Sequence, residues 1–212
     1  MENGRSYGCC AAIGGAGTAI FGLIAIAKGE NGYFINLYND GVYSDKSSGV
    51  KISVKANLYK KGEAKITVKA AGETTLLLRI PEWTNDFAVL VNGDKVVFDS
   101  VKGYALVKVS DGDKIIVSMR MRVERKILNG KAEYERGPIV LARDERFGED
   151  LGLPVAVPKK AGGAVAKLVK NDKFYTNETV TVKTKDGEIT LCDYSSAGKN
   201  YDSEKCNMAV WN

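Results

Sequence analysis

Strict alternation of apolar and polar residues constrains this chain more than any other feature of its sequence. Residues 50–55 read Val-Lys-Ile-Ser-Val-Lys, and residues 64–70 read Ala-Lys-Ile-Thr-Val-Lys-Ala. Because successive side chains of a β-strand point to opposite faces, each segment has one apolar and one polar face. A sheet of such strands packs on one side and meets water on the other, as antiparallel sheets commonly do.

Shorter apolar runs, separated by turn residues, extend this pattern along much of the chain. Pro81 ends the run 76–80, because proline has no N–H to donate to a neighbouring strand. Asn92-Gly93 is a dipeptide that strongly favours a two-residue hairpin turn. Short strands with turns at regular intervals predict a β-sandwich or jelly roll. The predicted strands are residues 33–38, 50–55, 64–70, 76–80, 89–91, 95–98, 104–109, 114–119, 179–183, 188–192 and 208–211.

Residues 11–27 (AAIGGAGTAIFGLIAIA) form a stretch of seventeen positions without a charged side chain. Such a stretch is compatible with a buried helix, a membrane span or the apolar part of a signal sequence. It lies at the short limit for a span, it is rich in Gly and Ala, and Arg5 is the one basic residue before it. We therefore predict a buried helix.

These patterns together predict a mainly β fold, in which antiparallel β-sandwich or jelly-roll domains follow one N-terminal apolar helix. With 212 residues, the chain is long enough for one sizeable domain or two small sandwiches. Between residues 144 and 173, Gly, Pro and Lys replace the alternation, which indicates an irregular connection. The predicted domains are residues 1–30 with the helix, residues 31–145 as a β-sandwich, and residues 146–212 as the connection and a second β layer or small β domain.

The distribution of charge argues against a nucleic-acid partner. The net charge of +5 arises from 31 basic and 26 acidic residues, and the lysines are scattered along the predicted strands. Scattered lysines at strand spacing are typical of a solvated face, whereas nucleic-acid binding requires a basic patch. We expect no nucleic-acid partner and, because the apolar helix is predicted to be buried, no membrane partner.

The absence of histidine removes the commonest general base and metal ligand, so any chemistry must come from Cys, Asp, Glu, Tyr or Lys. Cys9 and Cys10 are the most unusual candidates, because two adjacent thiolates can bind a soft metal such as zinc. Cys192, Cys206, carboxylates, water or groups outside the chain would have to complete a tetrahedral site. No Cys-x-x-Cys spacing supplies such ligands nearby, so thiols without a metal are the simpler expectation.

Three weaker groups of candidates have simpler structural explanations. Paired carboxylates can act as acid and base on a glycosidic bond, but a solvated strand edge also explains them. Acidic turns resemble calcium loops but carry too few ligands. Aromatic side chains can stack on sugars, although core packing is more common. The carboxylates are Glu133, Glu135, Asp144 and Glu145; the turns are residues 92–94 and 111–113; the aromatic residues are Trp83, Trp211, Tyr33, Tyr38, Tyr43, Tyr59 and Tyr104.

Several segments, taken in order, resemble one enzyme family. The segments are Gly8-Cys9-Cys10 before the Ala/Gly helix, residues 33–38 (YFINLY), residues 78–83 (LRIPEW), residues 91–93 (VNG), Gly112-Asp113, residues 135–141 (ERGPIVL) and residues 192–198 (CDYSSAG). Their order and spacing are similar to the C-terminal portion of the β-L-arabinofuranosidase-like glycoside hydrolases, glycoside hydrolase family 127 and its relatives. The resemblance spans nearly the whole chain.

The resemblance implies a longer enzyme, in which an (α/α) barrel precedes the β-sandwich domains and a zinc-bound cysteine attacks an arabinofuranoside. Cys9 then corresponds to the nucleophile and a zinc ligand, and Cys10 corresponds to a second zinc ligand. The family's other zinc ligands, a glutamate and a cysteine, and its acid/base glutamate are expected upstream of this chain. After the cysteine pair the chain reads AAIGGA, where relatives often carry prolines, an asparagine and an arginine, so the sugar is left open.

The expected function is therefore that of a C-terminal fragment of a retaining glycoside hydrolase, which supports a catalytic barrel and is inactive alone. Zinc belongs to the full-length family, and we expect this chain alone to bind none stoichiometrically. The expected partners are an arabinofuranoside-type glycan in the full-length protein and a second copy of the chain, through the N-terminal helix. A carbohydrate-binding or oligomerisation module is the alternative, and an enzyme completed by a separate barrel chain is a third possibility. The compartment is open.

Overall fold

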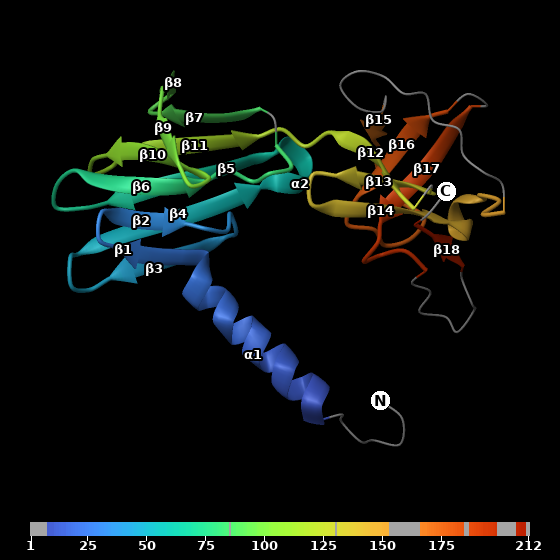
Figure 1. Ribbon diagram of the computed structural model, residues 1–212, viewed down its shortest axis with the longest axis horizontal. Coiled ribbons are helices and arrows are strands. Elements are labelled where there is room, and N and C mark those ends of the chain that lie inside the picture. The colour runs from blue at the N-terminus through green and yellow to red at the C-terminus, as the bar shows by residue number, and fades with distance from the viewer. Residues whose placement is uncertain are drawn as a thin grey trace. The chain divides into compact units, whose positions relative to one another are not determined.

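The computed structural model describes residues 8–84, 86–129, 131–152, 166–184, 187–198 and 207–210. It divides into two compact units, Met1–Arg120 and Met121–Asn212 (Figure 1). The predicted boundary between the two β domains lies after residue 145, whereas the second unit begins at Met121. The strands between residues 121 and 145 therefore belong to the second unit. The first unit has two sheets and the second has one, and each unit has its own core.

The first unit contains a five-stranded sheet, which we call the first sheet. Its strands lie in the order β1 (Ile26–Gly29), β2 (Gly32–Ile35), β6 (Thr74–Arg79), β10 (Tyr104–Val109) and β9 (Asp99–Val101). The run that ends before Pro81 forms β6, the central strand of this sheet. β2 and β6 pair in parallel, with Tyr33 opposite Leu76, and the other pairs are antiparallel.

A six-stranded antiparallel sheet, the second sheet, completes the sandwich of this unit. Its strands lie in the order β3 (Gly41–Asp45), β4 (Val50–Asn57), β5 (Glu63–Lys69), β11 (Lys114–Met119), β7 (Phe87–Val91) and β8 (Asp94–Lys95). The short helix α2 (Leu58–Lys61) joins β4 to β5. The two strands with the clearest alternation are therefore neighbours in one sheet.

The core of the first unit lies between these two sheets. Ile52, Val54 and Ile66 of the second sheet and Leu76 and Leu78 of the first sheet belong to one buried cluster. Each such side chain contributes about 1.5 to 3 kcal/mol by leaving water. The intervening polar residues of β4 and β5 are exposed or half-buried, so the prediction of one buried and one wet face is confirmed.

Turn chemistry explains how the chain passes between these strands. Asn92 and Gly93 have φ values of 54° and 99°, which suit the turn that joins β7 to β8. The Asn92 amide donates to Asp113 at 2.7 Å and accepts from the Lys114 N–H at 3.0 Å. The turn 110–113 passes from β10 in the first sheet to β11 (Lys114–Met119) in the second sheet, and these hydrogen bonds connect it to the β7–β8 hairpin.

The second unit is built on a third, antiparallel sheet. Its strands lie in the order β12 (Val123–Leu128), β13 (Lys131–Arg136), β14 (Ile139–Asp144), β17 (Glu188–Asp193), β16 (Thr179–Lys183) and β15 (Ala166–Leu168), and β18 (Met208–Ala209) pairs with β14. The 3-10 helix η2 (Glu145–Phe147) follows β14. Tyr134, Leu141 and Leu191 are central to a separate buried cluster on this sheet.

Several predicted strand limits differ from the structure. The predicted strand 33–38 ends at Ile35, because the next residues bind the end of a helix instead. The segment 95–98 keeps only Lys95 in β8. The stretch 144–173, predicted to be irregular, contains η2 and β15, while residues 153–165 lie outside the described part. The last predicted strand is reduced to β18, and Trp211 also lies outside the described residues.

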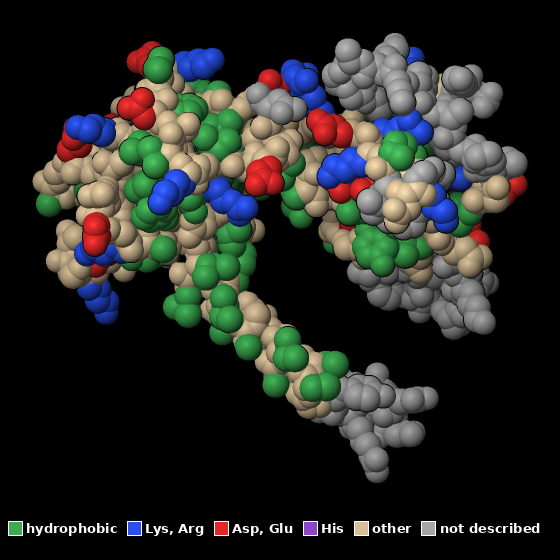
Figure 2. All heavy atoms as spheres, in the orientation of Figure 1, with side chains coloured by type: hydrophobic (Ala, Val, Ile, Leu, Met, Phe, Trp, Pro, Cys, Tyr) green, Lys and Arg blue, Asp and Glu red, His purple; other side chains and the backbone are tan. Residues whose placement is uncertain are grey.

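Helix α1 (Gly8–Ala25) precedes the first sheet and confirms the predicted N-terminal helix. Its side chains are exposed from Gly8 to Ile24, so the prediction of a buried helix is wrong: the described residues do not cover it. Figure 2 shows its apolar side chains in contact with solvent along its length. By length and its mean hydropathy of 1.7, α1 could cross a membrane, although core helices and signal sequences share these properties.

Candidate functional site

The cysteine pair lies on the first turn of α1. Cys9 and Cys10 are both exposed, and their Sγ atoms are 3.7 Å apart. Two thiolates on one tetrahedral zinc ion are separated by about 3.8 Å, because each Zn–S bond is about 2.3 Å long. The pair therefore fits two corners of a zinc site. Within the described ranges, no three Cys, Asp or Glu side chains gather as a metal site would require.

The four carboxylates proposed as acid and base do not converge. Glu135 forms an ion pair with Lys126, and Glu133 is half-buried on the same strand. Asp144 is fully buried, and the Arg146 guanidinium and backbone N–H both donate to it. Glu145 accepts instead from the Asn207 amide at 2.9 Å. Glu133 and Glu135 are half-buried on β13, which pairs with a strand on each side, and the buried Asp144 holds η2 in place. The simpler expectation of a solvated strand edge therefore does not describe these carboxylates.

Asp193 organises a polar cluster that the sequence reasoning did not assign. Its carboxylate accepts from the N–H groups of Asn177 and Glu178 at 2.9 and 3.0 Å. The hydroxyls of Ser195 and Ser196 also donate to it, at 2.5 and 2.8 Å. Burial raises the pKa of Asp193, but these hydrogen bonds lower it by more, so the pKa lies below its ordinary value. The sequence analysis noted the segment 192–198 only because it resembles the enzyme family, and it assigned no role to Asp193.

A buried ion pair joins β13 to the residue just before β16. Arg136 of β13 donates to the Glu178 carboxylate at 2.9 Å, and both side chains are almost fully buried. Burial raises the pKa of Glu178, while the charge of Arg136 opposes the shift. Such pairs contribute less to stability than their geometry suggests, because both charges lose their water. We therefore assign Arg136 and Glu178 a structural role.

The aromatic residues mostly pack inside the first unit and do not form a sugar-binding face. Tyr33 donates to Asp45 at 2.9 Å, and Tyr38 donates to the Arg79 carbonyl at 2.7 Å. The half-buried Trp83 packs against the core. Tyr43 meets Tyr33 edge-on at 5.8 Å, Tyr104 donates to Asn36, and Tyr59 is 55% exposed. Core packing, the simpler expectation, describes most of the set.

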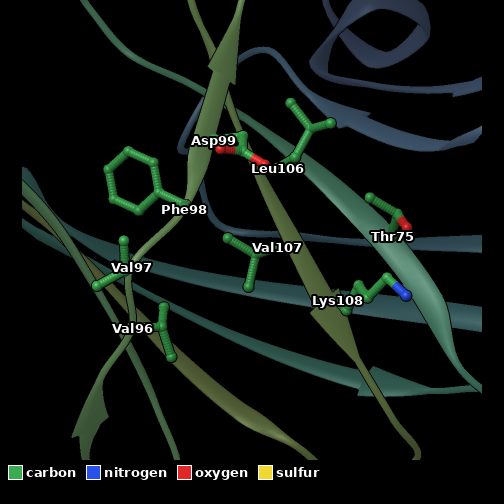
Figure 3. Close-up of a pocket in the computed structure, with 8 residues that line it drawn as sticks. All are labelled: Thr75, Val96, Val97, Phe98, Asp99, Leu106, Val107 and Lys108. Atoms are coloured by element: carbon green, nitrogen blue, oxygen red, sulfur yellow. The ribbon is translucent and has the colours of Figure 1, made fainter.

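A groove of about 410 Å³ opens in the first unit where β9 stops covering β10. Figure 3 shows Val96, Val97 and Phe98 along one side and Val107 and Lys108 along the other. The Val97 side chain is fully exposed. The Lys108 ammonium forms an ion pair with the Glu73 carboxylate, at 3.1 Å. The lining is mainly apolar and includes no residue of α1, so the groove is separate from the cysteine pair.

Comparisons with known proteins match this architecture. A family profile described as "Beta-L-arabinofuranosidase, GH127 middle domain" matches residues 32–121, which include every strand of the first unit's sandwich except β1. The predicted resemblance to the GH127 β-L-arabinofuranosidases is confirmed. A comparison with curated protein sequences found no match. The GH127 resemblance therefore rests on the profile and on solved structures.

Three solved structures share the fold of this chain. A GH127 β-L-arabinofuranosidase from Geobacillus stearothermophilus T6 has a TM-score of 0.75 and 24% identity, over 97% of this chain and 37% of its own. A GH127 β-arabinofuranosidase has a TM-score of 0.69 and 20% identity, over 88% and 35% of the two chains. A protein described as a glycoside hydrolase has a TM-score of 0.74 and 20% identity, over 97% of this chain and 39% of its own. The chain spans little more than a third of their lengths.

Proposed function

We propose that this chain is the α1 and β-domain region of a GH127-type glycoside hydrolase and supports a catalytic (α/α) barrel that lies outside it. The observation that carries the proposal is the GH127 middle-domain match over the sandwich that directly follows the cysteine-bearing helix. The exposed apolar surface of α1 also supports it, since the helices of such a barrel would cover that surface. The substrate class is an arabinofuranoside-type glycan.

In this proposal, Cys9 is the nucleophile and a zinc ligand, and Cys10 is a second zinc ligand. Their sulfur separation of 3.7 Å fits two ligands of one ion. Bound zinc would keep the thiols deprotonated at neutral pH. The chain's own contribution is to hold both sulfurs on one helical turn. An acid that protonates the leaving oxygen must come from outside the described residues, because their carboxylates do not gather beside the thiols.

The proposal predicts a chain that is inactive alone and binds zinc weakly. Elemental mass spectrometry on zinc-loaded, chelator-washed protein should find far less than one zinc per chain. Hydrolysis of a chromogenic β-L-arabinofuranoside should stay at the buffer rate. The Cys9→Ser/Cys10→Ser variant should give the same results. Stoichiometric zinc, or hydrolysis that this variant loses, would show that the chain builds the whole site and would overturn the proposal of a supporting region.

An oligomerisation module is the second candidate, and the exposed apolar side chains of α1 favour it. Ile13 and Leu23 are 73% and 76% exposed. If a second copy covers α1, sedimentation velocity should show an association that grows with concentration and is lost in Ile13→Lys/Leu23→Lys. The double variant Val97→Lys/Val101→Lys, which changes exposed apolar residues away from α1, should associate normally. A monomer at all concentrations would rule out this function.

A further inference from the structure

The junction between α1 and the first sheet contains no loop. α1 ends at Ala25 and β1 begins at Ile26, so the helix continues directly into a strand. The last carbonyl groups of a helix have no hydrogen-bond partner within the helix. Groups that bind these carbonyls therefore determine how firmly the helix is held and in which direction it leaves the sheet.

Residues just beyond β2 bind these terminal carbonyls. The backbone N–H groups of Asn36 and Leu37 both donate to the Ala25 carbonyl, at 2.9 and 3.2 Å. The Asn36 side-chain amide donates to the Ile24 carbonyl at 2.7 Å. Three donors thus converge on the C-terminus of α1, where the partial negative charge of the helix favours them.

The Asn36 amide is itself held in one orientation. Tyr104 of β10 donates its hydroxyl to Asn36 Oδ1 at 2.7 Å. The Tyr104 ring meets Phe34 of β2 edge-on, with the ring centroids 5.2 Å apart. A flipped amide would place its oxygen against the Ile24 carbonyl and its nitrogen against a hydroxyl that could then only accept. The cap therefore draws on two separate strands of the first sheet.

We propose that Asn36 is a positioning residue: it fixes the direction of α1 on the first sheet and thereby the location of Cys9 and Cys10. The thiols lie about 24 Å along the helix from the cap, so a tilt of about 10° would move them by about 4 Å. Displacements of this size are large compared with the tolerance of a catalytic group. The positioning of α1 does not depend on the proposed function; only its catalytic consequence does.

Distances between two spin labels test this inference on the chain alone. One label is placed at Cys10 in a Cys9→Ser/Cys206→Ser background, and the other at Lys51→Cys, an exposed position of β4 in the same unit. Cys192 is fully buried and stays unlabelled. Asn36→Asp keeps the shape of the side chain but removes the donor to Ile24 and places a negative charge at a helix C-terminus. Asn31→Asp adds the same charge in the exposed β1–β2 turn and is the matched control.

Asn36→Asp should widen the distance distribution, whereas Asn31→Asp should leave it as narrow as in the parent. Tyr104→Phe, which removes one hydroxyl, should give an intermediate width. Amide exchange at Asn36 and Leu37 should become about fivefold faster in Asn36→Asp, the change expected for the loss of one hydrogen bond. Circular dichroism and the thermal midpoint report whether each variant stays folded.

A distribution in folded Asn36→Asp as narrow as in the parent would overturn the inference. So would a widening of equal size in Asn31→Asp, because added charge rather than the lost donor would then explain it. Since no measurement here uses zinc, substrate or a barrel, failure of the proposed function would leave these outcomes unchanged. Failure of the positioning role would likewise leave the zinc and hydrolysis assays unaffected.

Discussion

At the scale of single residues, two buried carboxylates hold the loops of the second unit in place. Asp144 is held by Arg146 and accepts from the Gly198 N–H at 2.9 Å, which joins η2 to the turn after β17. Asp193 gathers donors from the segments before β16 and after β17. Both carboxylates are almost fully buried, and hydrogen bonds offset the loss of water. These loops are thus held by polar contacts rather than by a core of their own.

Asp193→Asn tests this role. The amide keeps the volume but loses the charge that its donors require, so we expect the free energy of unfolding to fall by about 2 to 3 kcal/mol at pH 7. Urea unfolding measures the change. Asp172→Asn, at an exposed aspartate of the same unit, is the control and should cost little. An unchanged unfolding midpoint in Asp193→Asn would contradict the assigned role.

The lowered pKa of Asp193 also predicts how this difference depends on pH. A carboxylate whose pKa is lower in the folded than in the unfolded state stabilises the fold above the unfolded pKa of about 3.9. That contribution is lost as the pH falls through the folded pKa. The difference in stability between the parent and Asp193→Asn should therefore be constant from pH 7 to about pH 5 and shrink below about pH 4. A difference that grows on acidification would contradict the direction of the shift.

At the scale of elements, close backbone contacts decide where α2 can join two strands. Gly62 follows α2 with φ at +65°, and its carbonyl accepts from the Met119 N–H at 2.6 Å. A Cβ atom at Gly62 would lie 2.4 Å from the Met119 carbonyl oxygen. Because that neighbour is backbone in a central strand, it cannot move aside without disturbing β11. Glycine is therefore required both for conformation and for space.

Gly62→Ala should destabilise the first unit more than Gly112→Ala. Gly112 has a similar φ of +80°, but open space surrounds its Cβ position, so alanine there meets conformational strain alone. We expect a cost of about 1 kcal/mol at Gly112 and clearly more at Gly62. Thermal unfolding of both variants measures the difference. An equal loss of stability in the two variants would show that the close contact with the Met119 carbonyl does not destabilise Gly62→Ala.

Local patterns in the sequence predicted some of these elements but not others. Alternation located β4 and β5, and Asn92-Gly93 located the hairpin, because both signals are local. The strand β15 was missed, since three residues are too few for a period to appear. The parallel pairing of β2 with β6 joins segments far apart in the chain, and no local pattern encodes it.

The candidate site was predicted only in part, for a related reason. The thiol pair was recognisable because its two members are adjacent in the sequence. The Asp193 cluster depends on the pairing of β17 with β16, which places Thr179 opposite Cys192 and brings the preceding residues to Asp193. The cap on α1 likewise combines residues from α1, the end of β2 and β10. Spacing within single segments cannot predict contacts that arise only when the sheets form.

At the scale of the whole molecule, we propose a region that acts together with a catalytic barrel. A barrel that covers α1 would explain why the apolar helix with the thiol pair is exposed in this chain. It would also agree with the GH127 middle-domain match in the first of the two β units. This chain spans little more than a third of the solved structures that share its fold, so the rest of one of these proteins can be combined with it in a test.

The most direct test is a chimera in which this chain replaces the matching region of the Geobacillus stearothermophilus T6 enzyme. We expect hydrolysis of a chromogenic β-L-arabinofuranoside above the rate of either part alone. Cys9→Ser should abolish the activity, whereas Cys192→Ser, at the buried thiol of the second unit, should largely keep it. A folded chimera without hydrolysis, or one whose activity survives Cys9→Ser, would contradict the proposed role of this chain and of Cys9.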